Sequence, residues 1–213
     1  MKVTISKAVG KLGECIPSIS LPPVETCRED APCREKCYAC KGRYRFPTVK
    51  NSLTENLEAY KKSPDFYFGE IDRTLTMVPY RFFRYHVAGD IPDAEYFARM
   101  CRLARKHKAT NFLCFTKKYD LVNAYIQKHT IPKNLRVVFS RWGSFPAENP
   151  NRFPEAYVKF KNDWAEIPEN AIECSGYCGE CVLSGKNCWN LKKGESVYFH
   201  EHYKSDAVAP QKF

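Results

Sequence analysis

The chain has 213 residues, of which 44% are hydrophobic, and a formal net charge of +10 at pH 7. This hydrophobic content excludes a disordered chain, and no apolar run approaches the roughly 20 residues that a membrane-spanning helix needs. We therefore expect a globular protein with no membrane partner. The positive charge favours an anionic small molecule or a nucleic acid as the partner, although the basic residues are spread along most of the chain.

Most of the 11 cysteines fall into two groups of four. Residues 1–14 lack the apolar core of a secretory signal, so we expect a cytoplasmic protein whose thiols are kept reduced. Cysteine clusters in such a protein bind metal more often than they form disulfides. The candidate metal ligands are Cys27, Cys33, Cys37 and Cys40 in the first group, and Cys174, Cys178, Cys181 and Cys188 in the second.

Residues 1–50 are expected to form a cysteine-rich loop region, since prolines are frequent there and apolar residues show little periodicity. Within it, "CREKCYAC" has the C-x3-C-x2-C spacing of radical S-adenosylmethionine (SAM) enzymes. Three thiolates at this spacing leave one iron of a [4Fe–4S] cluster open to the amino and carboxylate groups of SAM. Two features depart from that class. Ala39 stands where an aromatic residue is usual, and Cys27 offers a competing ligand, so three or four protein ligands remain possible.

Residues 51–62 show the periodicity of a helix, with Ser52 and Glu55 as a capping box. Residues 65–71, "DFYFGEI", are predicted to form a strand.

Residues 80–140 alternate between strands and helices. A strand over 80–87 places Arg84 and His86 on one face, and Asp93 is positioned to cap a helix that ends near residue 106. A strand over 110–116, a helix over 118–129 and a strand over 134–140 follow. Short connections between such elements are typical of a parallel sheet with right-handed crossovers.

The predicted fold is therefore α/β, with a partial parallel β/α barrel over residues 51–145, of the kind found in radical SAM proteins. Cysteine-rich loop regions over residues 1–50 and 146–213 flank this core, and we expect all three to form one domain.

Polar residues follow three consecutive strands at their carboxyl ends, where the chemistry of parallel β/α folds is located. We expect these residues to line one small-molecule pocket. They are His86, Gly89 and Asp90 after the first strand, Thr116, Lys117 and Lys118 after the second, and Ser140, Arg141 and Trp142 after the third.

The second cysteine group has the spacing C-x3-C-x2-C-x6-C, with Gly176, Gly179 and Gly185 interleaved. The glycines permit tight turns, so the four thiolates can surround one metal centre. Either a [4Fe–4S] cluster or zinc accepts such a ligand set.

Several separated blocks, among them "CREDAPCREKCYACKGRYRF", "RFFRYHVAGDIPD" and "CSGYCGECVLSGKNCW", resemble the phage and mobile-element gene product 88 family. That family resembles radical SAM proteins in its cysteine usage and α/β pattern. The resemblance implies that Cys27, Cys33 and Cys37 are the N-terminal ligands, in preference to Cys40. It also implies that the block of Phe83, Arg84, His86, Gly89 and Asp90 belongs to the shared site.

The leading hypothesis is a radical SAM-type enzyme with an active [4Fe–4S] cluster on the first cysteine group and an auxiliary cluster on the second. Arg84, Asp90 and Lys117 would hold anionic parts of the cofactor or substrate together with His86, the expected proton donor. Gly89, Thr116, Ser140 and Arg141 would contribute to cofactor binding. An enzyme of this type also needs a reductant protein.

Two alternatives remain open. Zinc or closed clusters could organise a basic module that binds nucleic acid. The chain could also be an electron-transfer or redox-sensing protein with no substrate of its own. The identity of a substrate, small or related to nucleic acid, does not follow from the residues.

Overall fold

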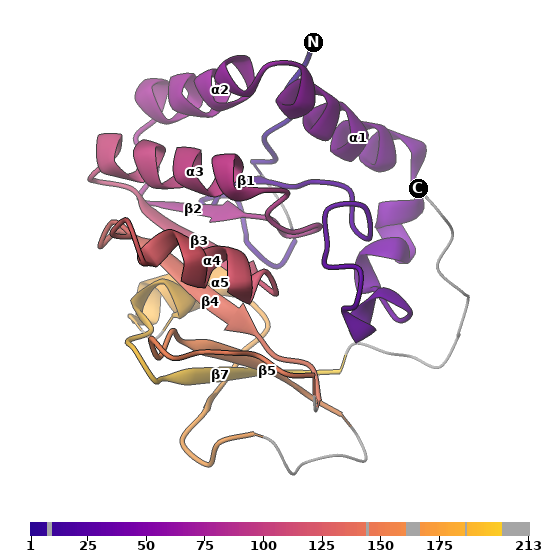
Figure 1. Ribbon diagram of the computed structural model, residues 1–213. Helices are drawn as coiled ribbons and strands as arrows, with labels where there is room; N and C mark the ends of the chain where they lie inside the picture. The colour runs from indigo at the N-terminus through magenta and orange to yellow at the C-terminus, as the bar shows by residue number, and fades with distance from the viewer. Residues whose placement is uncertain (8–9, 144, 161–166, 186, 202–213) are drawn as a thin grey trace.

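The computed structural model describes residues 1–7, 10–143, 145–160, 167–185 and 187–201, and its centre is a seven-stranded sheet in the order β1-β2-β3-β4-β5-β7-β6 (Figure 1). Every neighbouring pair is parallel. The predicted α/β class with a parallel sheet is therefore confirmed, and the linear strand order is compatible with a partial β/α barrel. The strands are β1 (Ser18–Ile19), β2 (Phe82–Tyr85), β3 (Asn111–Thr116), β4 (Leu135–Ser140), β5 (Glu155–Lys159), β6 (Ile172–Glu173) and β7 (Ser196–His200).

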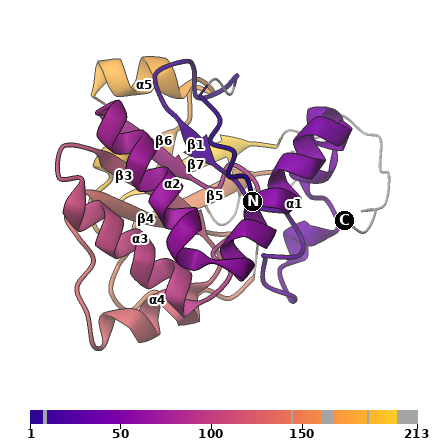
Figure 2. The same cartoon turned by 90° about the horizontal axis from the view of Figure 1, so that it is seen from above.

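Helices lie on both faces of this sheet. Figure 2 shows α2, α3 and α4 on one face, which we call the helical face, and α5 on the other, which we call the α5 face. Helices α3 and α4 form the crossovers from β2 to β3 and from β3 to β4. The helices are α1 (Pro47–Lys62), α2 (Pro64–Met77), α3 (Ala94–Lys106), α4 (Tyr119–Ile126) and α5 (Cys178–Ser184).

Alternation along the strands divides the buried residues between two cores. On the helical face, Phe83 and Phe112 pack with Tyr96 of α3. On the α5 face, Leu113 packs with Trp189 and with residues of the N-terminal segment. The α5 face therefore has its own apolar core, built by segments from both ends of the chain.

The predicted strand over residues 65–71 is wrong, because these residues lie within helix α2. The Ser63 side chain accepts a hydrogen bond from the backbone N–H of Phe66 at 3.2 Å, and Pro64 occupies the first helical turn, which favours helix initiation. Tyr67, Ile71 and Leu75 are buried at four-residue intervals, so the apolar pattern has the helical period once it is followed past residue 71.

Helix α1 is present as predicted but begins earlier, at Pro47. Ser52 is therefore inside the helix, where its hydroxyl donates to the carbonyl of Val49 at 2.7 Å, and the predicted capping box is wrong. The predicted cap of α3 is confirmed, since the Asp93 carboxylate accepts a hydrogen bond from the backbone N–H of Tyr96 at 2.8 Å.

The sheet draws strands from all three predicted regions of the chain. Strand β1 comes from residues 1–50, and β5, β6 and β7 come from residues 146–213. The last three strands were not expected from the sequence pattern. They are short, and β5 and β7 pair with each other across a gap of some forty residues, from Glu155 opposite Ser196 to Lys159 opposite His200.

In the described part of the chain, the helices are too short or too polar to span a membrane.

Gly89 lies where the chain leaves β2 and passes the loop that precedes the first cysteine group. Its φ is +79°, and a Cβ there would lie 2.6 Å from the carbonyl oxygen of Leu21 and 2.7 Å from the hydroxyl of Thr26. Only glycine combines this conformation with so close an approach.

We expect Gly89→Ala to lower the free energy of unfolding by about 2 kcal/mol or more, because it combines backbone strain with a clash against main chain. Gly69→Ala is the matched control. Gly69 is exposed within α2 with no atom near its missing Cβ, so alanine should raise stability by about 0.5–1 kcal/mol. Urea unfolding of both variants measures the difference, and equal stability of the two would contradict the close approach.

Candidate metal and ligand site

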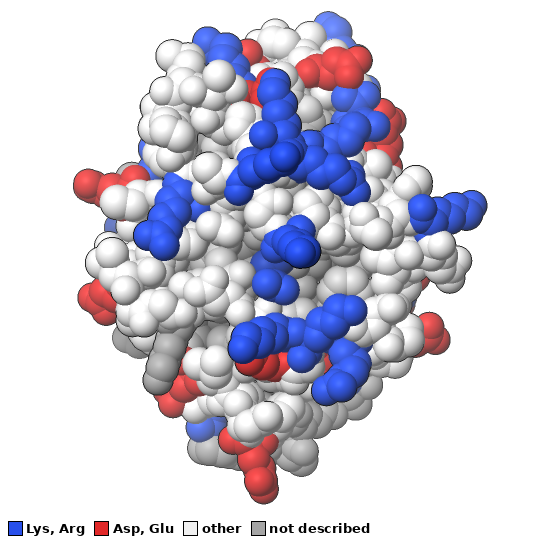
Figure 3. Space-filling model, turned by 90° about the vertical axis from the view of Figure 1, so that its left-hand side faces the viewer, with Lys and Arg blue, Asp and Glu red and all other residues white. Residues whose placement is uncertain are grey.

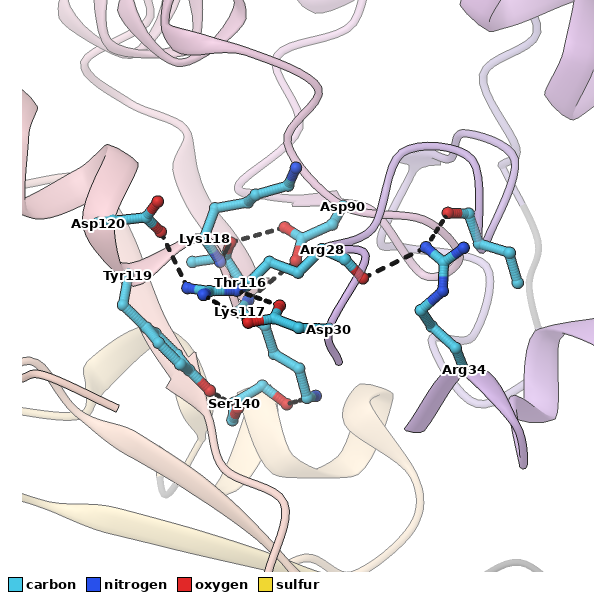
Figure 4. A network of polar contacts seen from close by, with 11 residues as sticks. Arg28, Asp30, Arg34, Asp90, Thr116, Lys117, Lys118, Tyr119, Asp120 and Ser140 are labelled. Carbon is cyan, nitrogen blue, oxygen red and sulfur yellow. Dashed lines mark hydrogen bonds and ion pairs between the residues drawn. The ribbon is translucent and has the colours of Figure 1, made fainter. Parts of the chain in front are cut away.

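A buried carboxylate, Asp90, connects the carboxyl ends of β2 and β3. It accepts hydrogen bonds from the Thr116 hydroxyl at 2.6 Å and from the backbone N–H of Lys117 at 2.8 Å (Figure 4). The backbone N–H of Ile91 also donates to it, at 2.7 Å. The backbone N–H of Asp90 donates to the hydroxyl of Thr26, one residue before the first cysteine, at 3.0 Å. Asp90 therefore holds two strand ends and the first cysteine group together.

Burial raises the pKa of the Asp90 carboxyl above its usual value, although the bond from Thr116 and the charge of Lys117 favour the ionised form. Thr116 is itself buried, and its hydroxyl also accepts from the backbone N–H of Lys118 at 2.9 Å. The side chains of Asp90 and Thr116 are thus buried below the carboxyl edge of the sheet, where they hold the backbone of Lys117 and Lys118.

Lys117 extends this cluster to the end of β4. Its ammonium donates to the Ser140 hydroxyl at 2.7 Å and lies 5.9 Å from the centre of the Trp142 ring. Arg141 is directed elsewhere, since its guanidinium donates to the carbonyl of Ala147 at 3.1 Å and lies 3.9 Å from the Glu155 carboxylate. The structure therefore brings together Gly89, Asp90, Thr116, Lys117 and Ser140, and it separates Arg141 from them; their roles in binding or catalysis stay predictions.

Two arginines that were not predicted from the sequence stabilise the first cysteine group, Arg28 by binding to α4 and Arg34 by bonds within the cysteine loop. Arg28 binds Asp30 at 2.8 Å and Asp120 of α4 at 3.1 Å (Figure 4). Its guanidinium also lies 5.5 Å from the centre of the Phe145 ring. Arg34 donates to the carbonyl oxygens of Val24 and Arg28, at 2.6 and 3.2 Å. In the sequence, Arg28 directly follows Cys27 and Arg34 directly follows Cys33, and this adjacency to candidate ligands could have identified both arginines.

Of the first group, Cys27 is the thiol that lies near the strand-end residues Asp90 and Lys117. Burial, followed by the charge of Asp90, raises the pKa of the Cys27 thiol to about 12, and the charges of Cys33 and Lys117 also act on it. Cys37 interacts with Cys40 and with Cys27. Cys40 interacts with Cys37 and with two lysines, Lys41 and Lys50, and neither Asp90 nor Lys117 acts on it.

All four cysteines of the second group line one pocket on the α5 face. Its walls are apolar, with Phe115 and Phe199 among them, and two basic side chains, Lys11 and Arg84, also line it. The N-terminal segment and the group are held together, because the backbone N–H of Cys178 donates to the carbonyl of Lys11 at 2.8 Å. A pocket lined by four thiols and two cations fits an anionic thiolate-bound metal centre.

Arg84 of β2 lies between the two cysteine groups. Its guanidinium is 4.8 Å from the centre of the Phe115 ring, and its Nε is buried without a hydrogen-bond partner among the described residues. Burial raises the pKa of the Cys188 thiol to about 12, and the positive charge of Arg84 opposes that rise. The same charge acts on Tyr38 and Tyr44 beside the first group.

His86 lies on the opposite face from Arg84, so the prediction that the two share a face is wrong. Its φ is +57°, a left-handed conformation that ends the strand alternation and turns the side chain to the helical face. There Nε2 lies 3.1 Å from the Tyr96 hydroxyl, which is 2.8 Å from the Tyr67 hydroxyl. Burial lowers the pKa of His86 to about 3. A neutral histidine bonded within a core is not placed to give a proton to a ligand beside Arg84.

The eight candidate ligands are free thiols in this structure. Within the described residues, no three or more His, Cys, Asp or Glu side chains are arranged to hold a metal ion. The choice between iron–sulfur clusters and zinc therefore stays a prediction that depends on the donor set.

Comparison with known proteins gives one family match. The family model described as gene product 88 matches residues 2–187. This span is more than half of the chain, so the protein belongs to the gene product 88 family, as its motifs predicted. No curated protein and no solved structure matches the sequence.

The buried histidine makes stability depend on pH. The pKa of His86 is about 3 in the folded state and 6.5 when unperturbed, so below pH 6.5 the unfolded chain binds a proton that the folded chain does not. Its contribution to stability is present above pH 6.5 and is lost as the pH falls, with a slope approaching about 1.4 kcal/mol per pH unit.

We expect the free energy of unfolding of His86→Asn to depend less steeply on pH between pH 6.5 and 4 than that of the wild type. Asparagine tolerates the left-handed backbone and does not titrate, so the contribution of His86 to the slope is removed. Chemical denaturation across this range measures it. His129→Asn, at an exposed position, is the control and should keep the wild-type slope. A His86→Asn profile parallel to the wild type would contradict a neutral buried histidine.

Proposed function

We propose that this member of the gene product 88 family is a radical SAM-type iron–sulfur enzyme, with its SAM-binding cluster on the first cysteine group and an auxiliary cluster on the second. The observation that supports this most is the position of the first group. It follows β1 directly and is tied by Thr26 to Asp90, at the carboxyl edge where Lys117 and Ser140 also lie. Parallel β/α enzymes place their chemistry at this edge.

Cys27, Cys33 and Cys37 are the proposed ligands of the first cluster. Cys27 interacts with both other thiols as well as with Asp90 and Lys117, whereas Cys40 interacts with Cys37 and with Lys41 and Lys50. Three ligands leave one iron open, and a reduced cluster of this kind binds SAM and cleaves its carbon–sulfur bond.

Lys117 is the proposed contact to an anionic group of the bound cofactor or substrate. An ammonium has three N–H donors, and the bond to Ser140 uses one and fixes its direction toward the edge. Asp90 and Thr116 act as positioning residues, since their side chains hold the Lys117 backbone and face the interior. His86 has no catalytic role in this proposal.

Arg84 and Lys11 support the auxiliary cluster. Four thiolates around a cluster give a net negative charge, and two cations lining the same pocket reduce the cost of burying it. Because Arg84 also acts on tyrosines of the first group, it is the residue through which the two centres would influence each other electrostatically.

The direct test is anaerobic purification with measurement of iron, sulfide and zinc, followed by electron paramagnetic resonance spectra. A brown, iron-containing protein that produces 5′-deoxyadenosine when SAM and a strong reductant are added would support the proposal. Colourless protein containing zinc alone would contradict it.

We expect Cys27→Ala to lose the first cluster and Cys40→Ala to keep it. With two [4Fe–4S] clusters in the wild type, Cys27→Ala should fall from about eight iron atoms per chain to about four. Iron analysis and a spectral change on addition of SAM measure the two effects. If Cys40→Ala loses as much iron as Cys27→Ala, four protein ligands close the cluster and the proposed SAM site fails.

We expect Lys117→Met to weaken SAM binding by about 10- to 100-fold, the usual loss for a hydrogen bond to a charged group. Lys118→Met is the matched control, since that residue contributes its backbone N–H to the edge and should bind SAM as the wild type does. Calorimetric titration of the cluster-loaded proteins compares them. Equal affinities in the two variants would exclude Lys117 as a ligand contact.

A further inference from the structure

Basic residues gather at the amino-terminal edge of the sheet, the end opposite the candidate site. Because the strands are parallel, the residues that precede each of them meet at one edge. Figure 3 shows Lys and Arg side chains in a band down the face at this end of the molecule. We call the following exposed set the basic edge: Arg81 before β2, Lys108 before β3, Lys133 before β4, and Lys192 and Lys193 before β7.

The backbone beneath the basic edge is held by a dense set of hydrogen bonds. The N–H of Asn111 donates to the carbonyl of Arg81 at 2.9 Å, and the N–H of Phe112 donates to that of Asn134 at 2.7 Å. The Asn134 side chain donates to the carbonyls of Ala104, His107 and Thr110 at 2.9–3.0 Å. The backbone that carries the basic side chains before β2, β3 and β4 is therefore held in place by hydrogen bonds.

A continuous set of contacts leads from the basic edge to the second cysteine group. The Arg81 guanidinium lies 5.5 Å from the centre of the Phe82 ring, and that ring is 5.4 Å from the ring of Trp189. Arg136 at the start of β4 donates to the carbonyl of Trp189 at 3.3 Å. Trp189 directly follows Cys188, which lines the four-cysteine pocket.

The charge of this surface selects an acidic partner. Glu195 is the acidic residue closest in sequence to its lysines, and its carboxylate accepts from the backbone N–H of Lys192 at 2.7 Å. Complementary charge speeds association and orients the partner. A surface that binds single-stranded nucleic acid usually adds aromatic rings on which bases stack. Here Phe82 and Trp189, the rings beneath the charges, are 9% and 4% exposed.

We propose that the basic edge is the docking surface of a small acidic electron-transfer protein, which delivers electrons to the second cysteine group past Trp189. This inference rests on the proposed function, because it requires a cluster on that group. One electron leaves the donor, which is oxidised, and reduces the cluster, with no bond formed or broken and no proton transferred.

The test compares two variants with the same change in charge. The edge variant carries Arg81→Glu, Lys133→Glu and Lys193→Glu, and the control variant carries Lys2→Glu, Arg43→Glu and Lys62→Glu at exposed positions elsewhere. The probe is a plant-type [2Fe–2S] ferredoxin, a small acidic electron carrier. Calorimetry at low and high salt measures its affinity for each cluster-loaded protein, and stopped-flow absorbance measures reduction by the ferredoxin and by dithionite.

We expect the edge variant to bind ferredoxin at least about tenfold more weakly than the wild type at low salt, and high salt to abolish the difference. Reduction by ferredoxin should slow in parallel, while dithionite, a small molecule that needs no docking surface, should reduce all three proteins equally. The control variant should match the wild type in both measurements.

Equal ferredoxin affinity in the edge variant and the wild type, with iron present in both, would overturn the docking surface alone. A loss confined to the control variant, or to Leu183→Glu on the exposed part of α5, would place the docking surface elsewhere. An edge variant that loses affinity for a DNA or RNA oligonucleotide but keeps its affinity for ferredoxin would assign the edge to nucleic acid. A wild-type protein without iron contradicts the proposed function itself.

Discussion

The candidate site depends on the burial of one carboxylate, that of Asp90. Hydrogen bonds from Thr116 and from the Lys117 backbone compensate for its loss of water, and they can form only if β2 and β3 end at the same level. The backbone of Asp90 also donates to Thr26, which brings the first cysteine group to the same edge. A charge that would be costly without these partners therefore specifies how the strand ends and the cysteine loop are arranged.

The two faces of the sheet have different chemistry. On the helical face, Tyr67, Tyr96 and His86 form a buried polar chain whose members bond to one another. On the α5 face, Arg84 keeps a buried Nε without a partner in the described chain and lies beside the four-cysteine pocket. Buried polar groups are normally paired. The hydroxyl of Tyr85, in the core of the helical face, is likewise buried without a partner in the described chain, so the pocket that Arg84 lines, and not the unpaired atom alone, distinguishes the α5 face.

The proposed enzyme separates its tasks along the strands as well. Ligand contacts lie at the carboxyl edge, where the first cysteine group, Lys117 and Ser140 meet. The proposed donor surface lies at the amino-terminal edge, with the second group and Trp189 between the two. In this proposal an electron-transfer protein would dock without covering the cofactor site, and each of the two cysteine groups would have a task of its own.

The sequence by itself determined the parallel α/β core from β2 to β4, the cap at Asp93 and the strand ends that meet, because these follow from local period and from the common direction of parallel strands. Tertiary structure decided the rest. A left-handed residue at His86 reversed its face, and helix initiation at Ser63 and Pro64 overrode a strand-like pattern. Strands β5 and β7 form through pairing with strands that are mostly distant in sequence, and Cys27 lies near Asp90 and Lys117, which are also distant in sequence.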